Sequence, residues 1–273
     1  MGGTVNTTTG ATSFTATGTS SPVTVTGLIE GQSYTVTVSA INAYGPSVMS
    51  AASNSVTTQK LEGELWAWGQ NNEGQLGQSN TTSYSSPVQV GALITWKHLS
   101  MGERYVLAVT SDGKLYSWGN ANDGQLGDGG TTDTSSPVQV GALTNWGNVS
   151  ALIQTSTAVK TDGTLWTWGK GTHGRLGDGT TVSKSSPVQV GALTNWLRTS
   201  AGYYHCHATK TDGTLWSWGN GTSGQIADDA QSNRSSPVQV GVLTTWDQVS
   251  AGINWGMAIK TDGTLYSWGS SYN

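Results

Sequence analysis

The chain has 273 residues, of which only 10% are charged, and its formal net charge is −4. It contains 38 glycines, and 13 tryptophans against one phenylalanine. The tryptophans, leucines and valines supply enough apolar area for a packed core, which excludes a disordered chain. Because no cluster of Lys and Arg occurs, nucleic acid and anionic membranes are disfavoured as partners. Cys206 is the only cysteine, so an internal disulfide is excluded.

Neither membrane insertion nor a signal peptide is expected. Crossing a bilayer takes an apolar run of about 18 residues, and no run approaches that length. The first ten residues, MGGTVNTTTG, have neither a basic start nor an apolar stretch. Export by another route, assembly inside a virus-producing cell and a fragment of a longer chain all remain open.

The first segment, about residues 1–58, alternates Val and Thr between turns that contain Gly. This period predicts antiparallel strands at 22–28 and 34–42 with one buried face, and residues 51–60 are expected to form a last strand and linker. The order of Leu28, Gly31 and Tyr34 resembles the C-terminal half of a fibronectin type III domain. That resemblance implies a β-sandwich-like segment. A full sandwich needs about 100 residues, so a simple β-rich spacer is the alternative.

The rest of the chain repeats one line five times, with a period of 50 residues. The line reads LWAWG, LYSWG, LWTWG, LWSWG and LYSWG, and it ends at Gly69, Gly119, Gly169, Gly219 and Gly269. In the repeat around 148–190 we predict four strands, named A to D, near 148–151, 155–160, 164–169 and 187–190. Such a unit cannot bury both faces of its own sheet, so neighbouring units must stack as the blades of a β-propeller.

Two further features support this reading of the repeats. The Asp-Gly pair between strands B and C, as at 162–163, is a strong hairpin signal. The proline of each PVQV run, such as Pro187, is tolerated only at a sheet edge or at the first residue of a strand. The Leu and Trp of the repeated line are expected to pack each strand C against the next repeat.

Several recurring motifs resemble the regulator of chromosome condensation repeat. They are GQLG at 74–77 and 124–127, GRLGDG at 174–179, the SSPVQV runs and TDGTLWSWG. The resemblance covers about residues 60–273 and implies an all-β propeller, usually of seven blades in that family. The family usually has a His just after strand A, and the matching positions here are Tyr105, Thr155, His205 and Trp255, so three of the four depart from that pattern.

The predicted strands divide residues 59–273 into a half blade, three full blades and a part blade. Strands A and B at the C-terminal end are able to complete the N-terminal half blade and close a four-bladed ring, with one strand C to spare. The alternative is a piece of a longer propeller, and assembly with other copies is also open.

Variation among the repeats concentrates in the A–B and C–D connections, which a four-stranded meander places on one face. Loops on a rigid scaffold commonly carry binding residues, so we predict a ligand-binding face there; drift in exposed loops is the alternative. The candidate residues are Asn72, Arg104, Tyr105, Asn122, His173, Tyr203, Tyr204, His205, His207, Asn254 and Trp255.

Other motifs point to no cofactor, metal or catalytic group. The G-x-G-x-x-G run at 169–174 lacks the following helix that a dinucleotide site requires. The sequence His205-Cys206-His207 alternates between strand faces and is expected to be a surface or partly buried cluster. Asp128, Asp178 and Asp228 are expected to bond nearby backbone amides in turns.

The sequence therefore predicts a non-enzymatic binding or structural module that recognises a protein or a glycan. Its low charge and its Thr/Ser/Gly content resemble phage virion and bacterial surface proteins, which implies an extracellular or virion setting. The alternatives are a guanine-nucleotide exchange or chromatin-binding factor and a carbohydrate-active propeller enzyme.

Overall fold

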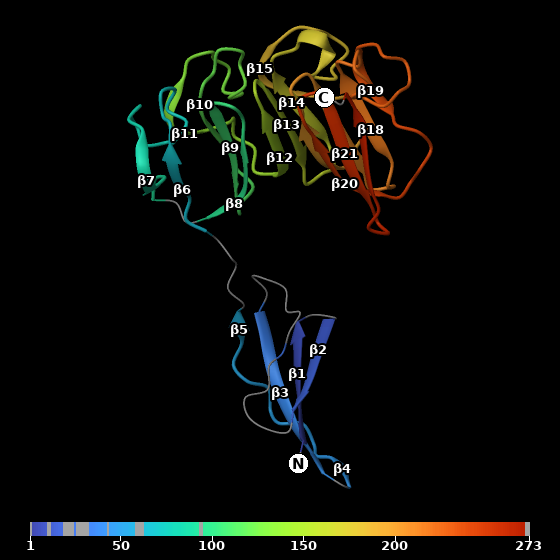
Figure 1. Cartoon of the computed structure of the whole chain (residues 1–273). Helices are drawn as coiled ribbons and strands as arrows, with labels where there is room; N and C mark the ends of the chain where they lie inside the picture. Colours follow the sequence, from blue (N-terminus) through green and yellow to red (C-terminus); the bar gives the residue numbers. More distant parts are fainter. Residues whose placement is uncertain are drawn as a thin grey trace. The chain divides into compact units, whose positions relative to one another are not determined.

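A computed structural model describes residues 2–9, 12–18, 25, 33–42, 44–57, 63–92 and 95–270. The chain divides into two compact units, Met1–Leu61 and Glu62–Asn273 (Figure 1). Both are built of strands, and the only helical element described is one 3₁₀ turn, η1 (Thr172–Gly174). None of the described residues belongs to a helix with the length and apolar character needed to cross a membrane.

The N-terminal unit is a small sheet in the order β2-β1-β3-β4, with β5 paired to β3. Its strands are β1 (Gly2–Thr9), β2 (Thr12–Gly18), β3 (Ser33–Asn42), β4 (Gly45–Pro46) and β5 (Val56–Thr57). The predicted strand at 34–42 is confirmed in β3, whereas only Val25 of the one at 22–28 lies within the described residues. The expected single buried face of 34–42 is wrong: Tyr34 is buried, but Val38 is 45% exposed.

The second unit contains five sheets in chain order, which we call the first to fifth sheets. The first pairs β6 (Trp66–Gly69) with β7 (Tyr84–Gln89). The second comprises β8 (Trp96–Met101), β9 (Tyr105–Thr110), β10 (Leu115–Gly119) and β11 (Thr134–Gln139). The third comprises β12 (Trp146–Leu152), β13 (Thr155–Lys160), β14 (Leu165–Gly169) and β15 (Lys184–Gln189). The fourth comprises β16 (Trp196–Ala201), β17 (His205–Lys210), β18 (Leu215–Gly219) and β19 (Arg234–Gln239). The fifth comprises β20 (Trp246–Ala251), β21 (Trp255–Lys260) and β22 (Leu265–Gly269).

Each complete sheet is an antiparallel meander of the predicted strands A to D, so the propeller prediction is confirmed. Strand B at 155–160 has the predicted bounds, and strand D begins three residues early, at Lys184. Pro187 therefore lies inside β15, which is tolerated because that strand forms the outer edge of its sheet. At Gly169 the pairing slips to Lys184 through a bulge, and the φ of +96° there favours glycine.

The sheets stack side by side, and we call the four contacts between them seams 1 to 4 (Figure 1). Each seam has its own apolar cluster, the largest being seam 2, where Leu115 and Trp146 are buried. In every seam the Trp just before the final glycine of the repeated line donates a hydrogen bond to a carbonyl of the preceding sheet's C–D loop. For Trp168 the acceptor is Gln125 O, at 2.8 Å. The expectation that this Trp packs on the next repeat is thus wrong in direction, because its indole is fixed to the preceding one.

Strands A are linked across the seams as well. The hydroxyl of Ser100 accepts a hydrogen bond from Ala151 N at 2.9 Å, and Ser150 accepts one from Ala201 N at 3.0 Å. The recurring serine of strand A therefore connects the backbones of neighbouring sheets.

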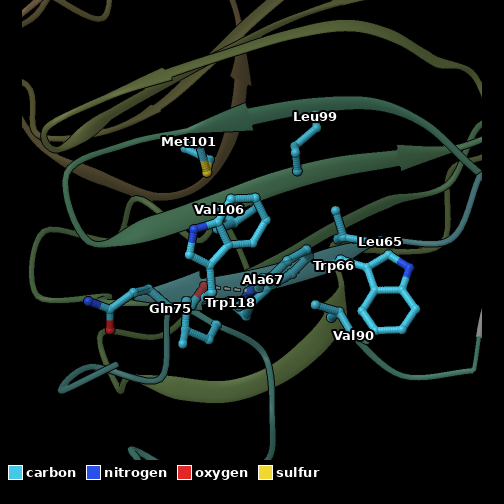
Figure 2. A pocket seen from close by; sticks show the side chains of 11 residues that line it. Leu65, Trp66, Ala67, Gln75, Val90, Leu99, Met101, Val106 and Trp118 are labelled. Atoms are coloured by element: carbon cyan, nitrogen blue, oxygen red, sulfur yellow. Dashed lines mark hydrogen bonds between the residues drawn. The ribbon is translucent and has the colours of Figure 1, made fainter. Parts of the chain in front are cut away.

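The first sheet leaves a groove of about 410 Å³ between β6 and β8, lined by Leu65, Trp68, Met101 and Trp118 among others (Figure 2). At the other seams, strands A and B of the preceding sheet occupy this place. Closure of a four-bladed ring is not seen among the described strands, because β20 and β21 pair within the fifth sheet and β6 pairs with β7.

Candidate binding face

The A–B and C–D connections lie on one side of the sheets, which we call the loop face. At each of the first three seams, the C–D loop of one sheet contacts a loop of the next on this face. At seam 1, Arg104 Nη1 lies 3.2 Å from Glu73 Oε1. At seam 2, Lys170 Nζ in the C–D loop of the third sheet lies 3.5 Å from Asp123 Oδ1 in the C–D loop of the second, and 3.0 Å from Gln154 Oε1 of its own sheet. The positions that vary among the repeats therefore meet one another across the seams.

Seam 3 brings aromatic rings together on the loop face. The rings of Tyr203 and Tyr204 have centroids 4.1 Å apart, and the ring of His173 lies edge-on to Tyr204 at 5.2 Å. His173 is exposed and the two tyrosines are half-buried. We call these three residues the aromatic cluster. It presents apolar faces with polar tips to solvent, a combination common in contact surfaces.

Arg175 supports the aromatic cluster from below. Its side chain is almost fully buried, and its Nη1 donates to Tyr203 O at 2.8 Å. Its Nε and Nη2 donate to Thr172 O and Thr172 Oγ1, at 3.0 and 2.6 Å. The guanidinium carbon lies 4.8 Å from the centre of the Tyr204 ring, within cation–π range. One side chain therefore connects the C–D loop of the third sheet to the A–B loop of the fourth.

The electrostatics of the cluster follow from these contacts. Burial and the Arg175 charge lower the pKa of His173, so this imidazole is neutral at physiological pH. The neighbouring Tyr204 raises the pKa of Tyr203, so the phenol stays protonated. Burial lowers the pKa of Arg175, but a guanidinium keeps its charge at neutral pH. The cluster thus combines neutral rings with one buried positive charge.

Three predicted site residues do not lie on the surface. Tyr105, His205 and His207 are at most 1% exposed, because the first and third residues of strand B point into a seam and the next sheet covers them. Including them in the binding face is wrong. The expected surface or partly buried cluster at His205-Cys206-His207 is also wrong, since all three are fully buried. Burial raises the pKa of the Cys206 thiol to about 12, which leaves it unreactive at neutral pH.

The other predicted site residues are accessible but do not form one patch. Trp255 is 42% exposed. It has the place in strand B that Tyr105 and His205 have, and in the fifth sheet no further described sheet covers that position. The exposed residues are Asn72, Arg104, Asn122 and His173, and the half-buried ones are Tyr203, Tyr204 and Asn254. Among these accessible residues, only His173, Tyr203 and Tyr204 have rings in contact with one another.

The aspartates of the C–D loops hold turns, as predicted. Asp128 Oδ1 accepts from Gly130 N at 2.9 Å, and Asp178 Oδ1 accepts from Thr180 N at 2.9 Å. Asp228 Oδ1 accepts from Ala230 N at 3.1 Å in the same way. Within the described parts of the chain, no group of three His, Cys, Asp or Glu is placed to hold a metal ion.

Arg175 is a residue of the candidate site that the sequence did not predict. The signal was present in the motif, since Arg175 stands where Gln75, Gln125 and Gln225 stand in the other repeats. The side chains of Gln125 and Gln225 form their hydrogen bonds within their own loops, for example Gln125 Nε2 to Asn120 Oδ1 at 2.7 Å. The longer arginine reaches the next repeat.

Comparison with solved structures places the fold among known propellers. The human WBSCR16 structure superposes with a TM-score of 0.67 at 21% identity, over 87% of this chain and 59% of that one. Yeast RCC1 (Prp20) in complex with Kap60 gives 0.65 at 22%, over 76% and 52%. Prp20p from Saccharomyces cerevisiae, from a study of its binding to Gsp1p and histones, gives 0.62 at 18%, over 93% and 66%. The chain thus spans between about half and two thirds of these proteins.

A search of curated proteins finds no match to the sequence. The profile of one family, described as the RCC1-like domain, matches residues 7–273. Together with the repeated four-stranded sheets, this match shows that the chain belongs to the RCC1-like domain family.

Proposed function

We propose that this chain is a non-enzymatic binding module that recognises a protein or a glycan through the aromatic cluster at seam 3. The observation that carries the proposal is the packing of His173, Tyr203 and Tyr204 at an accessible junction. The fold does not require these rings, because Glu103-Arg104 and Ile153-Gln154 fill the tyrosine positions in other repeats. Stacked phenols suit both sugar rings and protein hot spots.

The proposal is tested by measuring what the cluster binds. Wild-type protein and the Tyr203→Ala/Tyr204→Ala variant are applied to a glycan array and to a displayed peptide library. Tyr44→Ala is the matched control, because Tyr44 is a fully exposed tyrosine in the N-terminal unit. We expect binders that the double variant loses and the control keeps. If neither format yields a binder that distinguishes wild type from the double variant, the proposal is wrong.

The setting we propose is a phage virion or a bacterial surface, outside the cell. Low charge, the Thr/Ser/Gly content and a β-rich unit before the propeller support it by analogy. The N-terminal unit would then act as a fibronectin-like spacer. Capsid and tail genes flanking the coding sequence would support the virion setting, whereas flanking genes for chromosome maintenance would contradict it.

Guanine-nucleotide exchange is the second candidate function, and its support is the similarity to Prp20p, whose binding to Gsp1p and histones has been studied. A net charge of −4 disfavours a histone-and-DNA setting. Release of fluorescent GDP from a Gsp1p-type GTPase tests this candidate directly. Acceleration by the chain would favour exchange over the binding module, and an unchanged rate would remove it.

A further inference from the structure

Seam 4 encloses a pair of histidines that no other seam has. His205 and His207 lie on the same face of β17, because side chains of a strand alternate between its two faces. Both are 0% exposed, and their ring centroids are 4.8 Å apart. The ring of His207 also lies 5.2 Å from that of Trp268 in β22. The pair is therefore buried between the fourth and fifth sheets.

The fifth sheet is adapted to this pair at Gly256. A β-carbon built there would lie 2.4 Å from His207 Nε2 and 2.7 Å from the indole of Trp268. The other repeats have Val106, Ser156 and Cys206 at this place. A large imidazole on one side and a missing side chain on the other are complementary. The close approach of His207 to a glycine of the next sheet is thus specific to seam 4.

The imidazoles are buried without hydrogen-bond partners. Of the described residues, none meets hydrogen-bond geometry with any of the four ring nitrogens. Seam 2 is different, since the Tyr105 hydroxyl there donates to Thr155 O at 2.7 Å and accepts from Ser156 Oγ at 3.0 Å. A neutral imidazole keeps one N–H and one lone pair, and protonation makes both nitrogens donors. A proton on either ring would therefore be a buried charge without compensation.

The charged groups around seam 4 do not compensate a proton on His205 or His207. Arg198 of β16 and Asp247 of β20 pair with each other at 3.5 Å, and both are partly exposed. The ammonium groups of Lys210 and Lys260 lie over the rings of Trp196, Trp216, Trp246 and Tyr266. Arg175 lies on the opposite face of β17, where Cys206 Sγ contacts its carbonyl at 3.4 Å.

The burial of the two imidazoles decides how the stability of seam 4 depends on pH. Burial lowers the pKa of His205 to about 4 and that of His207 well below its ordinary value. The Trp255 backbone approaches His205 outside hydrogen-bond geometry and offsets only part of the effect. A separated seam restores ordinary histidine pKa values near 6.5, so below that pH the open form binds more protons than the closed form. The closed seam is thus fully favoured above about pH 6.5 and loses stability as the pH falls toward about 4.

We propose that seam 4 is an acid-sensitive joint, at which protonation of His205 and His207 releases the fifth sheet from the fourth. Its apolar cluster is small, with Leu215, Trp246 and Ala258 as the buried members. Opening this seam exposes the Trp268 ring and the two imidazoles together. The interiors of seams 1 to 3 contain no buried histidine pair among the described residues, and these seams stay closed.

Hydrogen exchange of the full chain tests the proposal. Protection of peptides from β20–β22 is compared at pH 7.5 and 5.0, after correction for intrinsic exchange, with β12–β15 as the internal reference. Below pH 6.5 the opening equilibrium should rise up to about tenfold per pH unit for each histidine. The matched variant is His205→Thr/His207→Thr, which installs the Thr155/Thr157 pair of the preceding sheet and should abolish the selective loss.

A titration of the wild-type histidines covers the case in which the variant does not fold. The chain has four histidines, so His98 and His173 serve as references in the same NMR spectrum. We expect His205 and His207 to stay neutral in the closed state and to titrate only as the β20–β22 signals lose dispersion. Titration near pH 6.5 without any change in the fifth sheet would overturn the proposal. Equal acid sensitivity of all sheets, or acid opening that persists in the Thr variant, would also overturn it.

Discussion

Seams 2 and 4 join sheets of closely similar sequence, yet their interiors are filled differently. Seam 2 encloses twelve buried apolar residues, and its one buried phenol, Tyr105, has both of its hydrogen bonds made. Seam 4 has three buried apolar residues in its cluster and two imidazoles without partners. The same backbone therefore supports a firm contact and a weak one. Part of the difference lies at the start of strand B, where seam 2 has Tyr105 and seam 4 has His205.

Removal of one indole should give the largest difference between the two seams. Trp168 is 0% exposed in seam 2, so Trp168→Ala should lower the free energy of unfolding by about 3–5 kcal/mol through lost packing. Trp268, half-buried in seam 4, should give a smaller loss on the same substitution. Urea denaturation followed by Trp fluorescence measures both. Trp68→Ala is the matched control, because this Trp has the same repeat position but is 60% exposed. Equal losses for Trp168 and Trp268 would remove the distinction between the seams.

The Tyr105 hydroxyl should give a smaller effect, confined to seam 2. Tyr105→Phe leaves Thr155 O and Ser156 Oγ without this partner and should cost about 1–2 kcal/mol. Because Ser156 shares the interaction, Ser156→Ala should be less destabilising in the Phe background than in wild type. A thermal-denaturation double-mutant cycle measures this coupling. Strict additivity would show that the Tyr105 hydroxyl and Ser156 are not coupled.

The lysines between aromatic rings should give the smallest effect. Lys160 Nζ lies 3.6 Å from the Trp166 ring centre and 4.6 Å from that of Trp146. Lys160→Met keeps the apolar stem, removes the charge and should lower stability by about 0.5–2 kcal/mol. Lys260 lies farther from its rings, at 4.3 and 5.6 Å, so Lys260→Met should have less effect in the same denaturation assay. An effect of Lys260→Met as large as that of Lys160→Met would contradict the cation–π explanation.

Much of the fold was predictable because the repeats state it five times. The Asp-Gly pair at 162–163 fixed the B–C hairpin, and the observed pairing of β13 with β14 confirms it. The division of the connections between two faces follows from an antiparallel meander. The turn at Asp178 was predictable because its side chain bonds the backbone only two residues further on, at Thr180 N.

Burial in the seams was not predictable from one chain read linearly. Tyr105 and His205 vary among repeats as exposed loop residues do, but they vary because each contacts a different partner in the next sheet. Variation therefore marks both the loop face and the seam interior, and only the neighbouring sheet separates them. Arg175 shows the same limit, since its single-letter departure from glutamine gave no indication that it reaches Tyr203 O.

The hydrogen bonds from each indole to the preceding sheet have a consequence for the synthesis of the chain and for the duplication of its repeats. Each donor follows its acceptor by 43 residues, as in Trp118 to Gln75 O and Trp218 to Arg175 O (Figure 2). During synthesis, the acceptor loop leaves the ribosome before the tryptophan that donates to it. Each repeat therefore forms this hydrogen bond with a repeat that has already been synthesised. A duplication of one whole 50-residue unit brings its own donor and its own acceptor. Repeats of this kind can therefore be gained or lost one at a time without leaving an indole donor or its carbonyl acceptor unpaired inside the array.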